Sequence, residues 1–127
     1  MKMRIKGNSL RLRVTRSELA RLEAGECLVE LTRLGPSPDN VLSYSLKSDE
    51  SAAEVTLNYQ PGRIEVLLPI AALRAWSGGD EVGIYVLLNV GNGESLEVAV
   101  EKDYACLDRS AEDNEDTFAN PHAGRVC

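Results

Sequence analysis

The sequence contains few aromatic residues and no long apolar run. Aromatic residues make up 5% of its 127 positions, so Leu, Val, Ile and Ala must supply most of a core. The longest apolar run, VLLPIAAL, is far shorter than the roughly 20 residues that a membrane-spanning helix needs. The basic start, MKMRIKGNSL, lacks the apolar stretch of a secretory signal. These absences predict a cytoplasmic protein that does not bind membranes.

Cysteine and histidine are also scarce, with three cysteines and a single histidine in the chain. Cys27, Cys106 and Cys127 form neither an even set nor a C-x-x-C pair, which favours reduced thiols in a reducing compartment. Structural zinc sites combine four ligands, typically in closely spaced pairs, and a thiol nucleophile needs a neighbouring base. We therefore predict no metal and no cofactor. The alternative is a small metalloprotein or enzyme that uses Cys106, His122 and Cys127.

Positive charge is in the minority, because 14 basic residues face 20 acidic ones and the net charge is −6. This balance opposes general nucleic-acid binding, which depends on clustered positive charge. The charges are nevertheless segregated along the chain. Residues 1–16 carry six cations and no acid, whereas residues 101–116 carry seven acids and two cations. Such segregation indicates a role for charge in recognition.

The first fourteen residues predict a β-hairpin with one charged face. MKMRIK and LRLRV alternate apolar and basic residues on either side of a GNS turn. Successive side chains of a strand point to opposite faces, so five cations share one face, called the basic face below: Lys2, Arg4, Lys6, Arg11 and Arg13. Like charges on paired strands destabilise a sheet. Three interpretations remain open, namely a solvated outer face, a docking site for the acidic tail, and a binding face for a phosphate-bearing small molecule or acidic partner.

The rest of the chain repeats one pattern of elements. A short helix over 15–25, with a capping box made by Thr15 and Glu18, leads into strand patterns at 27–33 and 41–47. The second half repeats this order, with alternating segments at 54–60 and 63–68, a helix opened by Pro69, and segments at 82–90 and 95–101. A shift of 54 positions superimposes the two patterns and places Leu22 on Trp76, which predicts that Trp76 belongs to the core.

These patterns predict a mainly β (α+β) domain in which two pseudo-symmetric ββαββ repeats and two short helices form a small β-barrel or a cradle-like sheet. A single domain spans 1–127, with repeat one at 1–47, repeat two at 54–101 and an irregular acidic C-terminal strap at 102–127. We expect residues 106–122 to pack on the basic face, with Phe118 as the large apolar anchor. The patterns are compatible with a monomer or a homodimer.

Two sets of segments resemble known families. GRIEVLLPIAALRAWSGGDEVGIYV resembles the repeat of AbrB/MraZ-type barrels at nine positions: Gly62, Arg63, Ile64, Pro69, Leu73, Arg74, Gly79, Asp80 and Val82. This resemblance implies a cradle-like barrel with interleaved halves and does not carry over DNA binding. KMRIKGNSLRLR at the start, with EKDYACL and DTFANP near the end, resembles a family of short bacterial proteins of unknown function, which implies no activity.

No catalytic motif accompanies these elements. GNG at 91–93 joins two strands as a hairpin turn, so it does not indicate a phosphate-binding loop. The favoured hypothesis is therefore a small non-enzymatic binding or accessory module that recognises an anionic ligand or an acidic partner through the basic face. Whether the protein catalyses a reaction stays open at this point.

Overall fold

The computed structural model describes residues 1–104, which form eight strands and two helices. The order of elements is ββαββ in each half of this part of the chain. The first half contains β1 Lys2–Ile5, β2 Ser9–Val14, α1 Arg16–Glu23, β3 Leu28–Arg33 and β4 Val41–Asp49. The second contains β5 Thr56–Gln60, β6 Arg63–Pro69, α2 Ile70–Gly78, β7 Gly83–Gly91 and β8 Glu94–Lys102. The mainly β fold class with two short helices is thus confirmed.

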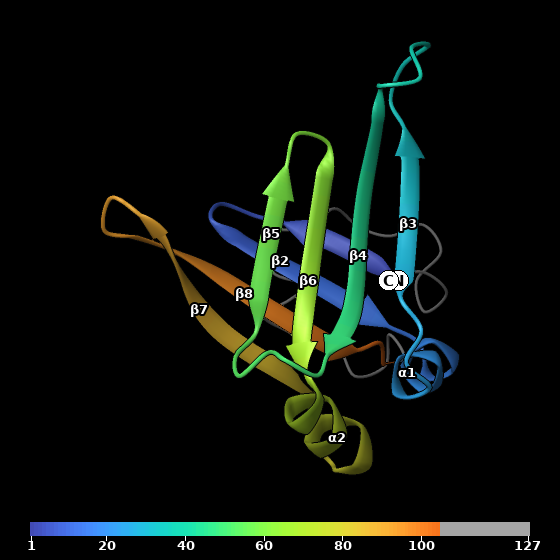
Figure 1. Cartoon of the computed structure of the whole chain (residues 1–127), viewed down its shortest axis with the longest axis vertical. Coiled ribbons are helices and arrows are strands. Elements are labelled where there is room, and N and C mark those ends of the chain that lie inside the picture. The colour runs from blue at the N-terminus through green and yellow to red at the C-terminus, as the bar shows by residue number, and fades with distance from the viewer. Residues whose placement is uncertain (105–127) are drawn as a thin grey trace, which may run out of the picture.

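The strands form two four-stranded sheets that each combine a hairpin from either half (Figure 1). Sheet A has the order β1-β2-β8-β7, and sheet B has the order β3-β4-β6-β5. The outer pairs of each sheet are antiparallel, whereas the central pairs, β2 with β8 and β4 with β6, are parallel. Each sheet ends in two edge strands, so the strands of residues 1–104 do not close into the barrel that we considered.

The pairing of strands follows the shift of 54 positions over much of the fold. Leu12 pairs with Val100 in sheet A, and Leu46 pairs with Val66 in sheet B. The shift makes Leu12 equivalent to Val66 and Leu46 equivalent to Val100, so the two pairs occupy equivalent positions in the two sheets. The β1–β2 and β5–β6 hairpins obey the same rule. The β7–β8 hairpin differs from β3–β4 by two residues of register. This regularity is compatible with an internal duplication, which stays an interpretation.

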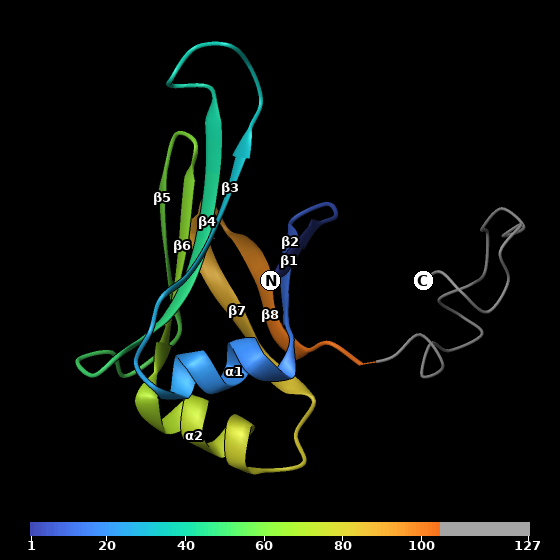
Figure 2. The ribbon, with the colours of Figure 1, turned by 90° about the vertical axis from the view of Figure 1, so that its right-hand side faces the viewer.

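The core lies between the two sheets and is closed at one end by the helices (Figure 2). Alternating apolar residues of the central strands point inward, and the two helices pack against each other beneath them. Leu22 of α1 and Trp76 of α2 are fully buried, as the superposition of the halves predicts. The indole nitrogen of Trp76 donates a hydrogen bond to the carbonyl oxygen of Val82 at 3.1 Å, so its one polar atom is satisfied. No helix within 1–104 has the length and apolar character needed to cross a bilayer.

The capping box predicted for the first helix is present. The backbone nitrogen of Glu18 donates to the hydroxyl of Thr15 at 3.3 Å, and the Glu18 carboxylate accepts from the backbone nitrogen of Thr15 at 2.9 Å. The same carboxylate also binds the amino group of Met1, which contacts Glu30 at 3.0 Å. Burial alone would raise the pKa of Glu18, but these hydrogen bonds outweigh it and hold the pKa below its usual value.

Candidate anion-binding face

Four of the five predicted cations lie on the outer face of sheet A. In the β1–β2 ladder, Lys2 is opposite Arg13 and Arg4 is opposite Arg11. The residues that alternate with them in β2, such as Leu12, point into the core. Lys6 follows the end of β1 and lies in the turn before β2. The hairpin therefore brings like charges together across the two strands, which is unfavourable unless an anion compensates them.

Two acids at the end of β8 provide part of this compensation. Because β8 runs parallel to β2, Glu101 lies opposite Arg13 in the sheet. The Oε1 atom of Glu101 is 2.9 Å from Nε of Arg11 and 3.7 Å from Nε of Arg13. An oxygen of Asp103 lies 3.4 Å from the amino group of Lys2. Glu101 of β8 and Asp103, which follows the end of β8, thus pair with three cations of the basic face.

Glu101 is the centre of a small polar network on this face. Its side chain is 12% exposed, and its Oε2 atom accepts a hydrogen bond of 2.6 Å from the hydroxyl of Tyr85 on β7. Oε1 is buried and accepts no hydrogen bond within residues 1–104, so its contacts with Arg11 and Arg13 are ion pairs without a directed bond. Burial and the nearby Glu101 carboxylate raise the pKa of Tyr85 to about 12.

Gly83 leaves the space that the Glu101 side chain occupies. The two residues are opposite each other in the β7–β8 ladder. A Cβ atom on Gly83 would lie 2.9 Å from Cγ of Glu101 and 2.5 Å from the carbonyl oxygen of Val100, both closer than real Cβ contacts. A residue without a side chain at this position therefore lets the carboxylate lie across the sheet toward Tyr85 and the arginines.

Arg4 and Lys6 have no acidic partner within the part of the chain that the structure describes. Both side chains are exposed, and Arg4 faces Arg11 directly across the hairpin. Glu101 lies on the opposite side of Arg11 from β1, since β2 separates β1 from β8 in the sheet. The basic face thus divides into a compensated part, around Glu101 and Asp103, and an uncompensated part at Arg4 and Lys6.

The uncompensated cations border a groove of about 800 Å³ on the outer face of sheet A. One row of residues, taken across β1, β2, β8 and β7, runs through it in the order Arg4, Arg11, Ala99 and Tyr85. The small side chain of Ala99 forms the floor between two large ones. Lys6 and Leu87 also contribute to the lining, on the basic and the β7 side respectively. The groove therefore offers positive charge along one wall.

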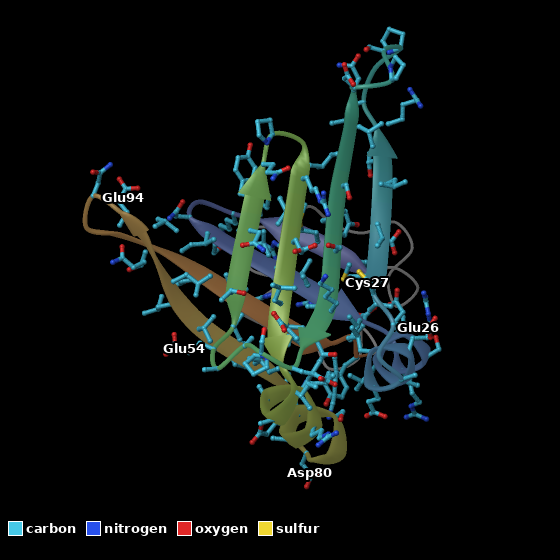
Figure 3. The ribbon with its side chains drawn as sticks, in the orientation of Figure 1. Glu26, Cys27, Glu54, Asp80 and Glu94 are labelled. Carbon is cyan, nitrogen blue, oxygen red and sulfur yellow. The ribbon has the colours of Figure 1, made fainter. Side chains whose placement is uncertain are left out.

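The other candidate residues do not assemble into a site within the described residues. Cys27 is exposed at the start of β3, next to Glu26 and close to α1 (Figure 3). The other acids labelled there, Glu54, Asp80 and Glu94, lie far apart on the periphery. Residues 1–104 contain no group of three His, Cys, Asp or Glu side chains placed to hold a metal ion. The alternative site and the predicted contact of the tail lie outside the described residues: Cys106, His122, Cys127 and the segment 106–122.

The sequence identifies neither the counter-ions nor Tyr85. It places Glu101 in the last predicted strand segment and Asp103 in the acidic strap, and both lie beside the hairpin because β8 pairs with β2. The signal that could have placed Glu101 is the alternation of SLEVAVE, which puts its acids on one face of a strand. The parallel pairing that brings this face next to Arg11 and Arg13 joins the two ends of the described chain, and local patterns do not reveal it.

The fold and this face define a class of protein, namely a small β-rich domain of two sheets with a basic groove on the outside of one of them. The chain belongs to a family of unknown function (DUF7009), which it matches over residues 1–122. No curated protein and no solved structure matches the chain.

Proposed function

We propose that the protein is a binding module that recognises an anionic group at the groove of sheet A, through Arg4, Lys6 and Arg11. The observation that carries the proposal is the uncompensated pair of cations at Arg4 and Lys6. Glu101 pairs with the arginines of β2 and does not pair with Arg4. An anion bound between Arg4 and Arg11 would therefore relieve the repulsion between these two opposite side chains. Guanidinium groups suit this role because their planar donors bind phosphate and carboxylate with two hydrogen bonds.

The charge of the whole chain limits the class of anion. With a net charge of −6, the molecule repels a long polyanion outside the groove, which argues against a nucleic-acid backbone and for a short ligand whose anionic groups lie at the groove. Glu97, which also lines the groove, adds to this repulsion. A single phosphate or carboxylate can contact the basic wall and stay away from Glu97.

The test is a titration of the full chain with inorganic phosphate, in which binding is monitored by the NMR chemical shifts of the backbone amides. We expect chemical-shift changes centred on β1 and β2. The double variant Arg4→Gln and Lys6→Gln should bind phosphate about tenfold more weakly, because a hydrogen bond to a charged group contributes roughly 1.5–3 kcal/mol and solvent exposure reduces this value. Arg74→Gln, which removes an exposed cation on α2, is the matched control and should bind as the wild type does. Equal binding by all three proteins would overturn the proposal.

A further inference from the structure

The wall of the groove opposite the cations is apolar. Tyr85 and Leu87 of β7 line it, and they are 58% and 69% exposed. Both side chains are on the outer face of an edge strand, since within residues 1–104 β7 pairs with β8 and with no other strand. Large apolar side chains exposed beside a cluster of charge mark sites of interaction more often than single scattered ones do. A simple anion would contact the basic wall and leave this apolar wall uncovered.

Tyr85 contributes an aromatic ring to the groove rather than a hydroxyl. Its O–H donates to Glu101 at 2.6 Å, and this bond holds the side chain over the sheet. The ring therefore has a fixed position at little entropic cost, which is a property of good contact residues. Leu87 makes no polar contact and adds apolar area further along the same strand. The two walls together present positive charge and a preformed apolar surface.

The width of the sheet sets the distance between these two features. Neighbouring strands lie about 4.8 Å apart, so Arg11 and Tyr85, which are separated by β8, are about 10 Å apart across the sheet. Arg4 is one strand further away, at about 14 Å. An extended peptide advances about 3.4 Å per residue, so an acid and an apolar residue two to four positions apart span roughly 7–14 Å. Such a peptide can reach both walls at once.

We infer that the ligand of the groove is a short acidic peptide segment with an aromatic or aliphatic side chain close to its acids, an inference that rests on the proposed function. The acids of the peptide would pair with the cations of the basic wall, and its apolar residue would pack on the exposed side chains of Tyr85 and Leu87. The groove is open enough to leave both side chains more than half exposed, whereas small-molecule sites enclose most of their ligand. A segment of a protein covers such an open surface better than a small molecule does.

The probe is the synthetic peptide AEDNEDTFA, which copies residues 111–119 and combines four acids with one phenylalanine. Its matched control carries Ala in place of the phenylalanine and keeps every charge. We expect the full chain to bind the first peptide about tenfold more tightly than the second, as measured by fluorescence anisotropy of labelled peptides. Leu87→Ala should reduce this difference, because it removes one of the two apolar side chains of the wall. Leu31→Ala, which removes a leucine that is also 69% exposed but lies in sheet B, should preserve it.

The same measurements separate the two proposals. If both peptides bind equally well to the wild type, and phosphate still binds through Arg4 and Lys6, the groove recognises anions alone and the peptide inference is overturned. If neither the peptides nor phosphate bind the wild type or its Phe118→Ala variant, which removes the expected apolar anchor of the chain's own tail, both proposals fail together. Tyr85→Phe keeps the ring but removes the hydrogen bond that holds it, so it should weaken the preference for the phenylalanine peptide less than Tyr85→Ala, which removes the ring. An unchanged preference in Tyr85→Ala would contradict the role given to the ring.

Discussion

Replacement of Glu101 by Gln tests whether this residue is the internal counter-ion of the basic face. Gln keeps the size of the side chain and a carbonyl oxygen for Tyr85, but it removes the charge beside Arg11 and Arg13. The two arginines are 40% and 46% exposed, so each ion pair contributes only about 0.2–1 kcal/mol. The hydrogen bond from Tyr85 loses roughly a further 1 kcal/mol when its acceptor becomes neutral. We expect the free energy of unfolding to fall by about 1–3 kcal/mol.

The assay is thermal and urea unfolding of the full chain at low and high salt. For a chain of this size, a loss of 1 kcal/mol lowers the melting temperature by about 4 °C, so Glu101→Gln should melt roughly 4–12 °C below the wild type. Glu97→Gln is the matched control, because Glu97 is the preceding outward-facing acid of β8 and makes no ion pair within residues 1–104. Its effect should remain within about 0.5 kcal/mol. Salt should reduce the effect of Glu101→Gln, because ions screen the exposed arginines.

The reasoning would be refuted by equal melting temperatures of Glu101→Gln and Glu97→Gln at both salt concentrations. That result would mean that the arginines of β2 are stabilised without Glu101. A second possible result, a large loss that does not depend on salt, would assign the effect to packing and to the Tyr85 hydrogen bond instead of to charge. Tyr85→Phe then identifies the contribution of the hydrogen bond, since it removes the hydroxyl and leaves both ion pairs in place.

Three further predictions concern ionisable groups. A spectrophotometric titration should show a tyrosine that ionises at a pKa of about 12, and Tyr85→Phe should remove that step. Because the pKa of Glu18 in the folded protein lies below its usual value of 4.5, its contribution to stability is present above that pH and is lost as the pH falls through the lowered pKa. The free energy of unfolding of Glu18→Gln, measured with urea, should accordingly change less with pH in the acid range than that of the wild type. An unchanged pH dependence would contradict the pairing of Glu18 with Met1. Elemental analysis of the purified chain should find no stoichiometric zinc or iron, and a chelator should not change the number of reactive thiols. If the chelator removes metal and new reactive thiols appear, that result would favour the alternative site at Cys106, His122 and Cys127.

The local elements of the fold could be predicted from the sequence because each has a short-range signature. The alternation of LRLRV places Leu10, Leu12 and Val14 on one face of a strand, and all three are buried. The capping box of Thr15 and Glu18 identifies the start of α1. Such patterns depend on residues that are near one another in the chain, so one sequence is enough to recognise them.

The assembly of these elements could not be predicted in the same way. Alternation identifies which residues of a strand face inward, but it does not identify the neighbouring strand. Both a closed barrel and two open sheets satisfy the same inward and outward pattern, and only the pairing at the edges distinguishes them. The partner of Arg11 depended on that pairing: an acid at position 101 could have lain against any strand. The candidate site was therefore predicted as a charged face, without its counter-ion and without its apolar wall.

The interleaving of the two halves also determines when the protein can fold. The central strand of sheet A needs β8, the last strand of the described chain, and Leu10 pairs with Val98 across nearly the whole length of that chain. Until β8 is synthesised, the hairpin of β1 and β2 has no neighbouring strand among residues 1–104, and β4 lacks its partner β6 until that strand is made. Contacts between residues so distant in sequence slow folding and leave sheet edges exposed to other chains. A growing chain on the ribosome can therefore complete sheet B, whose strands all lie within residues 28–69, before it can form the central pair of sheet A.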